Sequence, residues 1–341
     1  MGSCCCSRLL QLHSVRLMLP LSPSLSFSSN CHVSSSAHLI PSHQQPHPPS
    51  SQLVALEYAD LNLSYNLDLG HVRIRQHVNP LSSSFSVPAQ VPDWNQVFAD
   101  PTLPLMVDIG CGSGRFLMWL AKRTPKERNF LGLEIRERIV KRAEVWVKDL
   151  ALDNIHFLFA NATISFKQLV ESYPGPMVLV SILVSLSPCS RNPKTWFLYL
   201  SSTDCHLIIY IIYFFSIRLC PDPHFKKRHH KRRVLQKPLV GAIVDNLMPG
   251  GQVFIQSDVL EVALDMRNQF DEIEALKHTD VLNPALLCDS EGWLLSNPMG
   301  IRTEREIHAE LEGAKIFRRL YQKQIQSRNR AADSSKTRMA G

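Results

Sequence analysis

The stretch LPLMVDIGCGSGRFLMWLAKR, residues 103–123, joins an apolar segment to an amphipathic one through a glycine-rich turn. The segment before the glycines is almost continuously apolar, as expected of a strand that is buried on both faces of a sheet. After the glycines, apolar residues recur at helical spacing. Glycine permits sharp turns and lets a ligand approach the backbone without a Cβ in the way. The stretch therefore predicts a strand, a ligand-accessible turn and a helix.

The same alternation of strand and helix continues along the chain. Apolar runs predict strands at residues 129–135, 154–162, 176–183 and 252–258. Helical patterns occupy residues 136–152, 164–173, 233–251 and 259–270, and the third of these is predicted to close on Gly250 and Gly251. Residues 314–324 are predicted to form a late edge strand. Together these elements predict an α/β fold with a doubly wound, mostly parallel sheet.

Composition limits the classes of protein. The chain has 341 residues and a formal net charge of +7, enough for one large domain that prefers an anionic partner wherever its charge is clustered. Its nine cysteines include no C-x-x-C pair, so we predict no metal site, no disulfide framework and a reducing compartment. The apolar run at 207–215 is too short for a membrane-spanning helix, and we predict no membrane segment.

The N-terminal segment differs from the rest. No acidic residue precedes Glu57, and serine is abundant, which is typical of an organelle transit peptide. A plain disordered tail is the alternative, and an acyl anchor on MGSCCCS is a weaker one because Cys6 stands where Ser or Thr is required. We expect a disordered segment at 1–56, a catalytic domain at 57–330 and a disordered tail at 331–341. The expected location is the plastid, with the mitochondrion or the nucleus as alternatives.

One segment interrupts the domain. Residues 184–219 separate the strand that ends in VLVSIL from the turn CPDPHF. Their composition differs from that of the rest of the domain, with a single acidic residue. Their Ile-, Tyr- and Phe-rich end would be encoded by T- and A-rich codons, as in a translated pyrimidine tract. We interpret the segment as a retained intron or a gene-model read-through. The competing interpretation is a genuine loop, which loop-closure entropy alone does not forbid.

The glycine turn VDIGCGSG suits a compact zwitterionic ligand such as S-adenosylmethionine. Its spacing matches neither the dinucleotide motif nor a phosphate loop. Gly110 and Gly112 would contact this ligand, and Asp108 could hold the loop or the ligand's amino group. Glu134, at the end of the next strand, is expected to accept hydrogen bonds from a ribose, and Asn161 could bind near an adenine. The alternative for each is a purely structural turn or surface residue.

A stiff turn with one carboxylate precedes a basic run. Pro221 and Pro223 restrict the backbone on both sides of Asp222 and preorganise its carboxylate as the catalytic group. The run KKRHHKRR at 226–233 is predicted to bind nucleic-acid phosphates, with a nuclear signal or a solvated basic face as alternatives. The predicted RNA-binding residues are Lys227, Arg228, Lys231, Arg232, Arg233, Arg73 and Arg75.

Five segments together carry a family resemblance. VDIGCGSGRF, GLEIR, ANA, LCPDPHFKKRHHKRR and NPMGIRTERE resemble the tRNA (guanine-N7-)-methyltransferases over roughly residues 59–323. The resemblance implies a seven-stranded methyltransferase sheet of Rossmann-like type, S-adenosylmethionine as methyl donor and a guanosine in the tRNA variable loop as target. It departs from the family in the long N-terminus and in the segment 184–219.

The resemblance also assigns residues. The donor site would comprise Gly110, Glu134, Ile135, Asn161, Ala162 and Leu219, with Leu183 as an equal alternative to Leu219. Asp222 would be the active-site aspartate. The substrate-binding positions would be Lys226, Thr303, Glu304, Arg305 and Glu306. We also place Asp258, the last residue of QVFIQSD, among the substrate-binding candidates. The alternatives are a methyltransferase for another RNA, or an impaired splice product that only binds tRNA; a protein partner or homodimer is not decided by the sequence.

Overall fold

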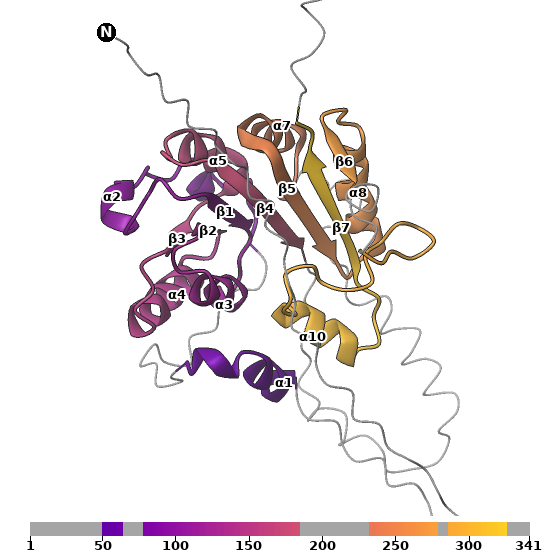
Figure 1. The fold of residues 1–341 in the computed structure, drawn as a ribbon, viewed down its shortest axis with the longest axis horizontal. Coiled ribbons are helices and arrows are strands. Elements are labelled where there is room, and N and C mark those ends of the chain that lie inside the picture. Colours follow the sequence, from indigo (N-terminus) through magenta and orange to yellow (C-terminus); the bar gives the residue numbers. More distant parts are fainter. Residues whose placement is uncertain (1–49, 64–77, 185–231, 279–285, 326–341) are drawn as a thin grey trace, which may run out of the picture. The chain divides into compact units, whose positions relative to one another are not determined.

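A computed structural model describes residues 50–63, 78–184, 232–278 and 286–325. Within these residues the strands form one seven-stranded sheet with the order β3-β2-β1-β4-β5-β7-β6 (Figure 1). Strands β1 to β5 run parallel, and β7 is antiparallel to both β5 and β6. The sheet has the predicted doubly wound, mostly parallel architecture.

The element boundaries follow from the sequence patterns. The strands are β1 (Leu105–Ile109), β2 (Asn129–Glu134), β3 (Ile155–Phe159), β4 (Met177–Val184), β5 (Leu247–Ser257), β6 (Leu276–His278) and β7 (Phe317–Lys323). The principal helices are α1 (Ser50–Glu57), α3 (Arg115–Arg123), α4 (Glu137–Asp149), α5 (Ala162–Glu171), α7 (Lys237–Asn246), α8 (Leu260–Asp271) and α10 (Glu304–Leu311). Short helical turns lie at η1 (Ala59–Leu61), η2 (Ser83–Phe85) and α2 (Trp94–Val97).

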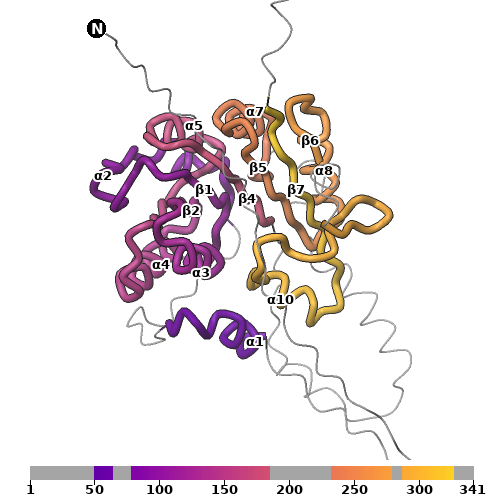
Figure 2. Tube along the Cα trace, in the orientation of Figure 1, coloured from indigo at the N-terminus to yellow at the C-terminus, as the bar shows by residue number. Residues whose placement is uncertain are grey.

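Two hydrophobic cores lie on opposite faces of the sheet. One contains side chains of α5, α7 and α8, such as Phe166, Ile243 and Met266. The other contains side chains of α3, α4, α10 and α1, such as Leu117, Trp146 and Val54. The colours of Figure 2 show that each face combines helices from distant parts of the chain. Because both faces are covered, the central strands are apolar on both sides, as the sequence indicated.

Helix α1 begins at Ser50, before the domain boundary predicted at residue 57. It packs into the second core through Val54, which is 6% exposed. Glu57 accepts a hydrogen bond from the Arg302 guanidinium at 2.5 Å, and the Tyr58 hydroxyl donates to the Arg302 carbonyl at 2.6 Å. The folded domain therefore starts no later than Ser50. Among the described residues, no helix is long and apolar enough to cross a bilayer.

Two predicted elements differ from the structure. The helix expected over 233–251 ends at Asn246, and Gly250 and Gly251 lie inside β5, where the register with β4 shifts. The strand near the C-terminus, β7, is not at the edge of the sheet, because β6 pairs with its free side. β6 has three residues, too few to produce a readable alternation.

Candidate functional site

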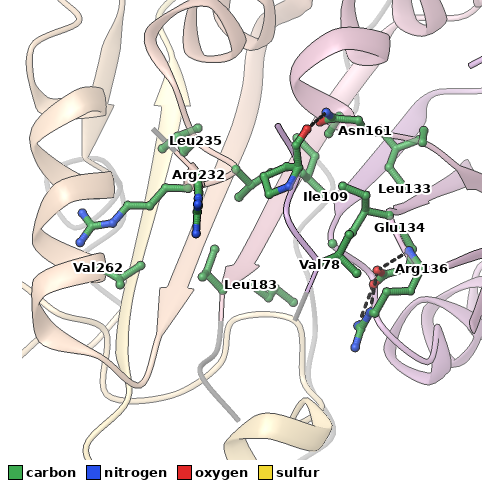
Figure 3. A pocket seen from close by; sticks show the side chains of 18 of the residues that line it. Val78, Ile109, Leu133, Glu134, Arg136, Asn161, Leu183, Arg232, Leu235 and Val262 are labelled. Carbon is green, nitrogen blue, oxygen red and sulfur yellow. Dashed lines mark hydrogen bonds and ion pairs between the residues drawn. The ribbon is translucent and has the colours of Figure 1, made fainter. Parts of the chain in front are cut away.

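The site lies where the strand order reverses between β1 and β4. In open α/β sheets, ligands bind at the carboxyl ends of the strands beside such a switch point. A cavity of about 270 Å³ occupies this position. It is lined by Ile109, Gly110, Glu134, Ile135, Ala160, Asn161, Ala162, Leu183 and Val184 from the strand ends. Figure 3 shows Glu134, Arg136 and Asn161 on one side of the cavity, with Arg232, Leu235 and Val262 on the other.

The glycine loop leaves room for a ligand. Gly110 and Gly112 have φ values of +80° and +57°, which L side chains rarely adopt, and no atom lies within 4 Å of a Cβ built on either. The Gly112 N–H donates to Glu134 Oε2 at 3.0 Å, so the loop is tied to the end of β2. A loop held in this way, with open space above it, fits a ligand that contacts backbone atoms, such as S-adenosylmethionine.

Glu134 is buried and paired. Its side chain is 3% exposed, and both of its oxygens accept hydrogen bonds from the Arg136 guanidinium at 2.9 Å (Figure 3). The Arg136 backbone N–H also donates to Oε1 at 3.0 Å. The carboxylate is therefore fixed by hydrogen bonds at the cavity wall, in the place where a ribose acceptor was predicted.

Asp108 is a buried residue of β1 that is hydrogen-bonded to β4. Its side chain accepts a hydrogen bond from the Ser181 hydroxyl of β4 at 2.7 Å, and the residue is 2% exposed. Burial, opposed by this hydrogen bond and reinforced by Glu134, raises the pKa of Asp108 to about 7. The side chain thus links β1 to β4, and its two predicted roles, holding the loop or the ligand's amino group, stay predictions.

Asn161 has three hydrogen-bonding tasks. It is the N-cap of α5, where its side-chain oxygen accepts from the Thr163 N–H at 3.2 Å. Its amide nitrogen donates to the carbonyls of Pro80 and Phe85, each at 3.2 Å. These contacts hold the segment after residue 78 against the cavity, and Val78 and Pro80 are part of its lining. The side chain is therefore occupied, and its predicted contact with an adenine stays a prediction.

The opposite wall follows the basic run. Arg232 and Arg233 line the cavity together with Asp265 of α8. Arg233 is 7% exposed and pairs with Asp265 at 2.8 Å, so its charge is directed to a carboxylate of α8. Its predicted contact with RNA stays a prediction, as does that of Arg232. The other predicted residues of this region lie outside the described residues: Arg73, Arg75, Leu219, Asp222, Lys226, Lys227, Arg228 and Lys231.

The predicted substrate positions at 303–306 form the start of α10. Thr303 is its N-cap and Glu306 its third residue, and they form a reciprocal capping box. Glu306 is fully buried and pairs with Arg318 of β7 at 2.6 Å. Asp258 pairs with Arg305 at 2.8 Å and is 4% exposed. These contacts are structural, and a role for these side chains in substrate binding stays a prediction.

Sequence reasoning missed Arg136 and the contacts that Glu304 makes. Arg136 lies two residues after the predicted acid, but nothing in its position signals a bidentate pair with Glu134. Glu304 contacts Ser113 of the glycine loop and Arg115 at the start of α3 across nearly two hundred positions of the chain, and no local pattern indicates these contacts. The capping box was readable, because Thr-x-x-Glu is a sequence signature of a helix start.

Known methyltransferases are similar to this chain in sequence. A family model described as "Putative methyltransferase" matches residues 102–178 and 213–319. A tRNA (guanine-N(7)-)-methyltransferase of Synechococcus sp. is 41% identical over 238 residues, which cover 70% of this chain and 79% of the relative. The chain belongs to the tRNA (guanine-N(7)-)-methyltransferase family. A relative with the same name from Synechococcus elongatus is 38% identical over 257 residues, 75% of this chain and 99% of the relative.

A putative rRNA-methylase from Clostridium thermocellum has a TM-score of 0.37 and 11% identity, over 64% of this chain and 88% of that one. A likeness of this size adds nothing to the family assignment. The family model omits residues 179–212, which overlap most of the unusual segment 184–219.

Proposed function

We propose that this enzyme transfers a methyl group from S-adenosylmethionine to N7 of a guanosine in tRNA. Beyond the family membership, one observation supports this function. Val78 and Arg232 both line the donor cavity, and Val78 follows the Arg73 and Arg75 segment while Arg232 belongs to the basic run. Val78, three residues after Arg75, and Arg232 therefore lie at the same cavity, and we expect a polyanion bound by the basic residues to lie beside the methyl donor.

The donor cavity supplies the binding groups. Gly110 and Gly112 present backbone atoms with open space above them, Glu134 presents a fixed carboxylate, and Ile135 and Ala162 present the walls of the cavity. The bound donor would supply an electrophilic methyl group on a sulfonium. The role of the protein is to orient this group and to exclude water from it.

The acceptor chemistry asks for positioning and charge stabilisation. Guanine N7 carries an in-plane lone pair and no proton, so the transfer requires no strong general base. In-line alignment of the two reactants provides most of the rate acceleration that a protein can supply here. Positive charge moves onto the purine as the methyl group arrives, and the carboxylate of Asp222 would stabilise it or hold the guanine N1–H and N2–H.

The test uses the full chain with labelled S-adenosylmethionine and a tRNA mixture. Mass spectrometry of the digested tRNA should find labelled 7-methylguanosine in the variable loop. A matched variant, Arg232→Ala, should weaken tRNA binding and reduce the salt dependence of that binding by roughly one phosphate contact. Label in another base, or in another RNA only, would refute the proposed substrate.

We further propose that the protein acts in plastids. The acid-poor, Ser-rich start of the chain supports import into an organelle. A fluorescent fusion of residues 1–47, which end before α1, should enter plastids. A mitochondrial, nuclear or cytosolic signal would overturn this location.

A further inference from the structure

We propose that Glu304 is a positioning residue for the methyl-donor site, because its carboxylate holds the glycine loop at a second point besides Glu134. This inference rests on the proposed function. Glu304 is the first residue of α10, and its Oε1 accepts hydrogen bonds from the Ser113 hydroxyl and from Arg115 Nη1, the latter at 2.8 Å. Ser113 lies between the last two glycines of the loop, and Arg115 begins α3.

The loop is thereby fixed at two consecutive residues by two carboxylates. The Gly112 N–H donates to Glu134 Oε2 at 3.0 Å, and the Ser113 hydroxyl donates to Glu304. Glycines on both sides of Ser113 have positive φ, so the intervening backbone has little intrinsic stiffness of its own. External hydrogen bonds must therefore select the loop conformation that the donor binds.

The charge around Glu304 supports this role. The Arg115 and Arg142 guanidiniums lie over the ring of Trp146, at 4.7 Å and 4.8 Å from its centroid. Burial, followed by repulsion from Arg115, lowers the pKa of Arg142, and Glu304 opposes this shift. The carboxylate thus compensates two neighbouring cations at the base of the loop, and its removal would leave them repelling each other.

Helix α10 itself is firmly anchored, so it can serve as a support. Its capping box joins Thr303 to Glu306, and Glu306 pairs with the buried Arg318 of β7. On the adjacent residue, Arg302 is bonded to Glu57 of α1. Glu304 therefore connects an anchored helix to the glycine-rich loop through its hydrogen bond with Ser113.

The test compares Glu304→Ala and Ser113→Ala with the control Glu310→Ala. Glu310 lies on the same helix but pairs with Arg302, away from the loop. Calorimetry with S-adenosylmethionine and no tRNA should show donor affinity about tenfold weaker for Glu304→Ala, since a hydrogen bond to a charged group is lost. Ser113→Ala should weaken it too, and the double variant should lose no more than Glu304→Ala alone. Glu310→Ala should bind normally.

Steady-state kinetics separate positioning from general damage. We expect a higher KM for the donor, an unchanged kcat at saturating donor, and an unchanged KM for tRNA in both loop variants. Unchanged donor affinity with a raised KM for tRNA would overturn the inference and make Glu304 a substrate contact. If Glu304→Ala does not fold, normal donor affinity of Ser113→Ala refutes the inference equally. Failure of the unmodified protein to bind the donor would instead refute the proposed function.

Discussion

Replacing Glu306 with glutamine should destabilise the fold far more than it affects tRNA binding. Oε1 of Glu306 accepts from Arg318 Nε at 2.8 Å and Nη2 at 2.6 Å. Oε2 accepts from the Thr303 N–H at 2.6 Å and from the Asn297 side-chain amide at 2.8 Å. In Glu306→Gln an amide NH2 replaces one of the two carboxylate oxygens. This donor would face either the Arg318 donors or those of Thr303 and Asn297, in a site without solvent.

The magnitude follows from burial. Glu306 is 0% exposed, and the Arg318 side chain is 8% exposed. Removing one partner of a buried ion pair leaves an uncompensated charge and costs about 3–5 kcal/mol. For a domain of this size that corresponds to a melting temperature lower by roughly 10 °C. The matched control Glu310→Gln removes an exposed ion pair from the same helix and should change stability by less than about 1 kcal/mol.

Urea unfolding followed by circular dichroism measures the difference. The midpoint of Glu306→Gln should fall with the m-value unchanged. The double variant Glu306→Leu/Arg318→Met, which removes both charges, should recover much of the loss, because buried pairs can be replaced by apolar groups of similar size. A Glu306→Gln variant with normal stability and weakened tRNA binding would refute this reasoning and support the substrate role.

Four further outcomes are expected. Asp108→Asn should flatten the pH dependence of the free energy of unfolding. With the pKa of Asp108 raised from 3.8 to about 7, the folded protein keeps a proton that the unfolded chain releases, and this stabilises the fold by about 4 kcal/mol below pH 4 and is lost as the pH rises through 7. A variant whose free energy of unfolding changes between pH 5 and pH 8 as much as that of the unmodified protein would contradict this. Asp222→Ala should abolish methyl transfer and leave donor binding within a few fold, and near-normal turnover would reduce this residue to a turn former. Deletion of residues 184–219 should give a more soluble protein that is at least as active, whereas loss of activity, together with transcripts that always contain these codons, would show a functional insertion. Deletion of residues 1–47 should leave the free energy of unfolding unchanged, but deletion of residues 1–57 should lower it by about 2 kcal/mol because buried Val54 of α1 is lost. Equal melting temperatures of the two deletion variants would show that α1 does not support the core.

The sequence was informative where the physical constraint is local. An apolar strand, a glycine turn and an amphipathic helix each impose a pattern on neighbouring residues, so the β1–loop–α3 unit and the acid at Glu134 were predictable. α1 was hidden because SSQLVALE carries almost no charge and lies next to a Pro- and Ser-rich segment. β6 was hidden because it is short, and its presence turned the predicted edge strand β7 into an interior one.

The site depends more on contacts between distant residues. The pairs Glu304–Arg115 and Glu306–Arg318 are properties of the folded topology, since only the packing of α10 beside the glycine loop and β7 brings these groups together. The Thr-x-x-Glu pattern fits two interpretations, a substrate contact and a helix start. Burial of Glu306 favours the second, and burial is not visible in a sequence.

One geometric feature reaches beyond the chemistry of the site. β4 ends at Val184, the described chain resumes at Arg232, and both residues line the donor cavity. Loops of different length could therefore join β4 to Arg232 without changing the order of the strands, because loop-closure entropy rises slowly with length.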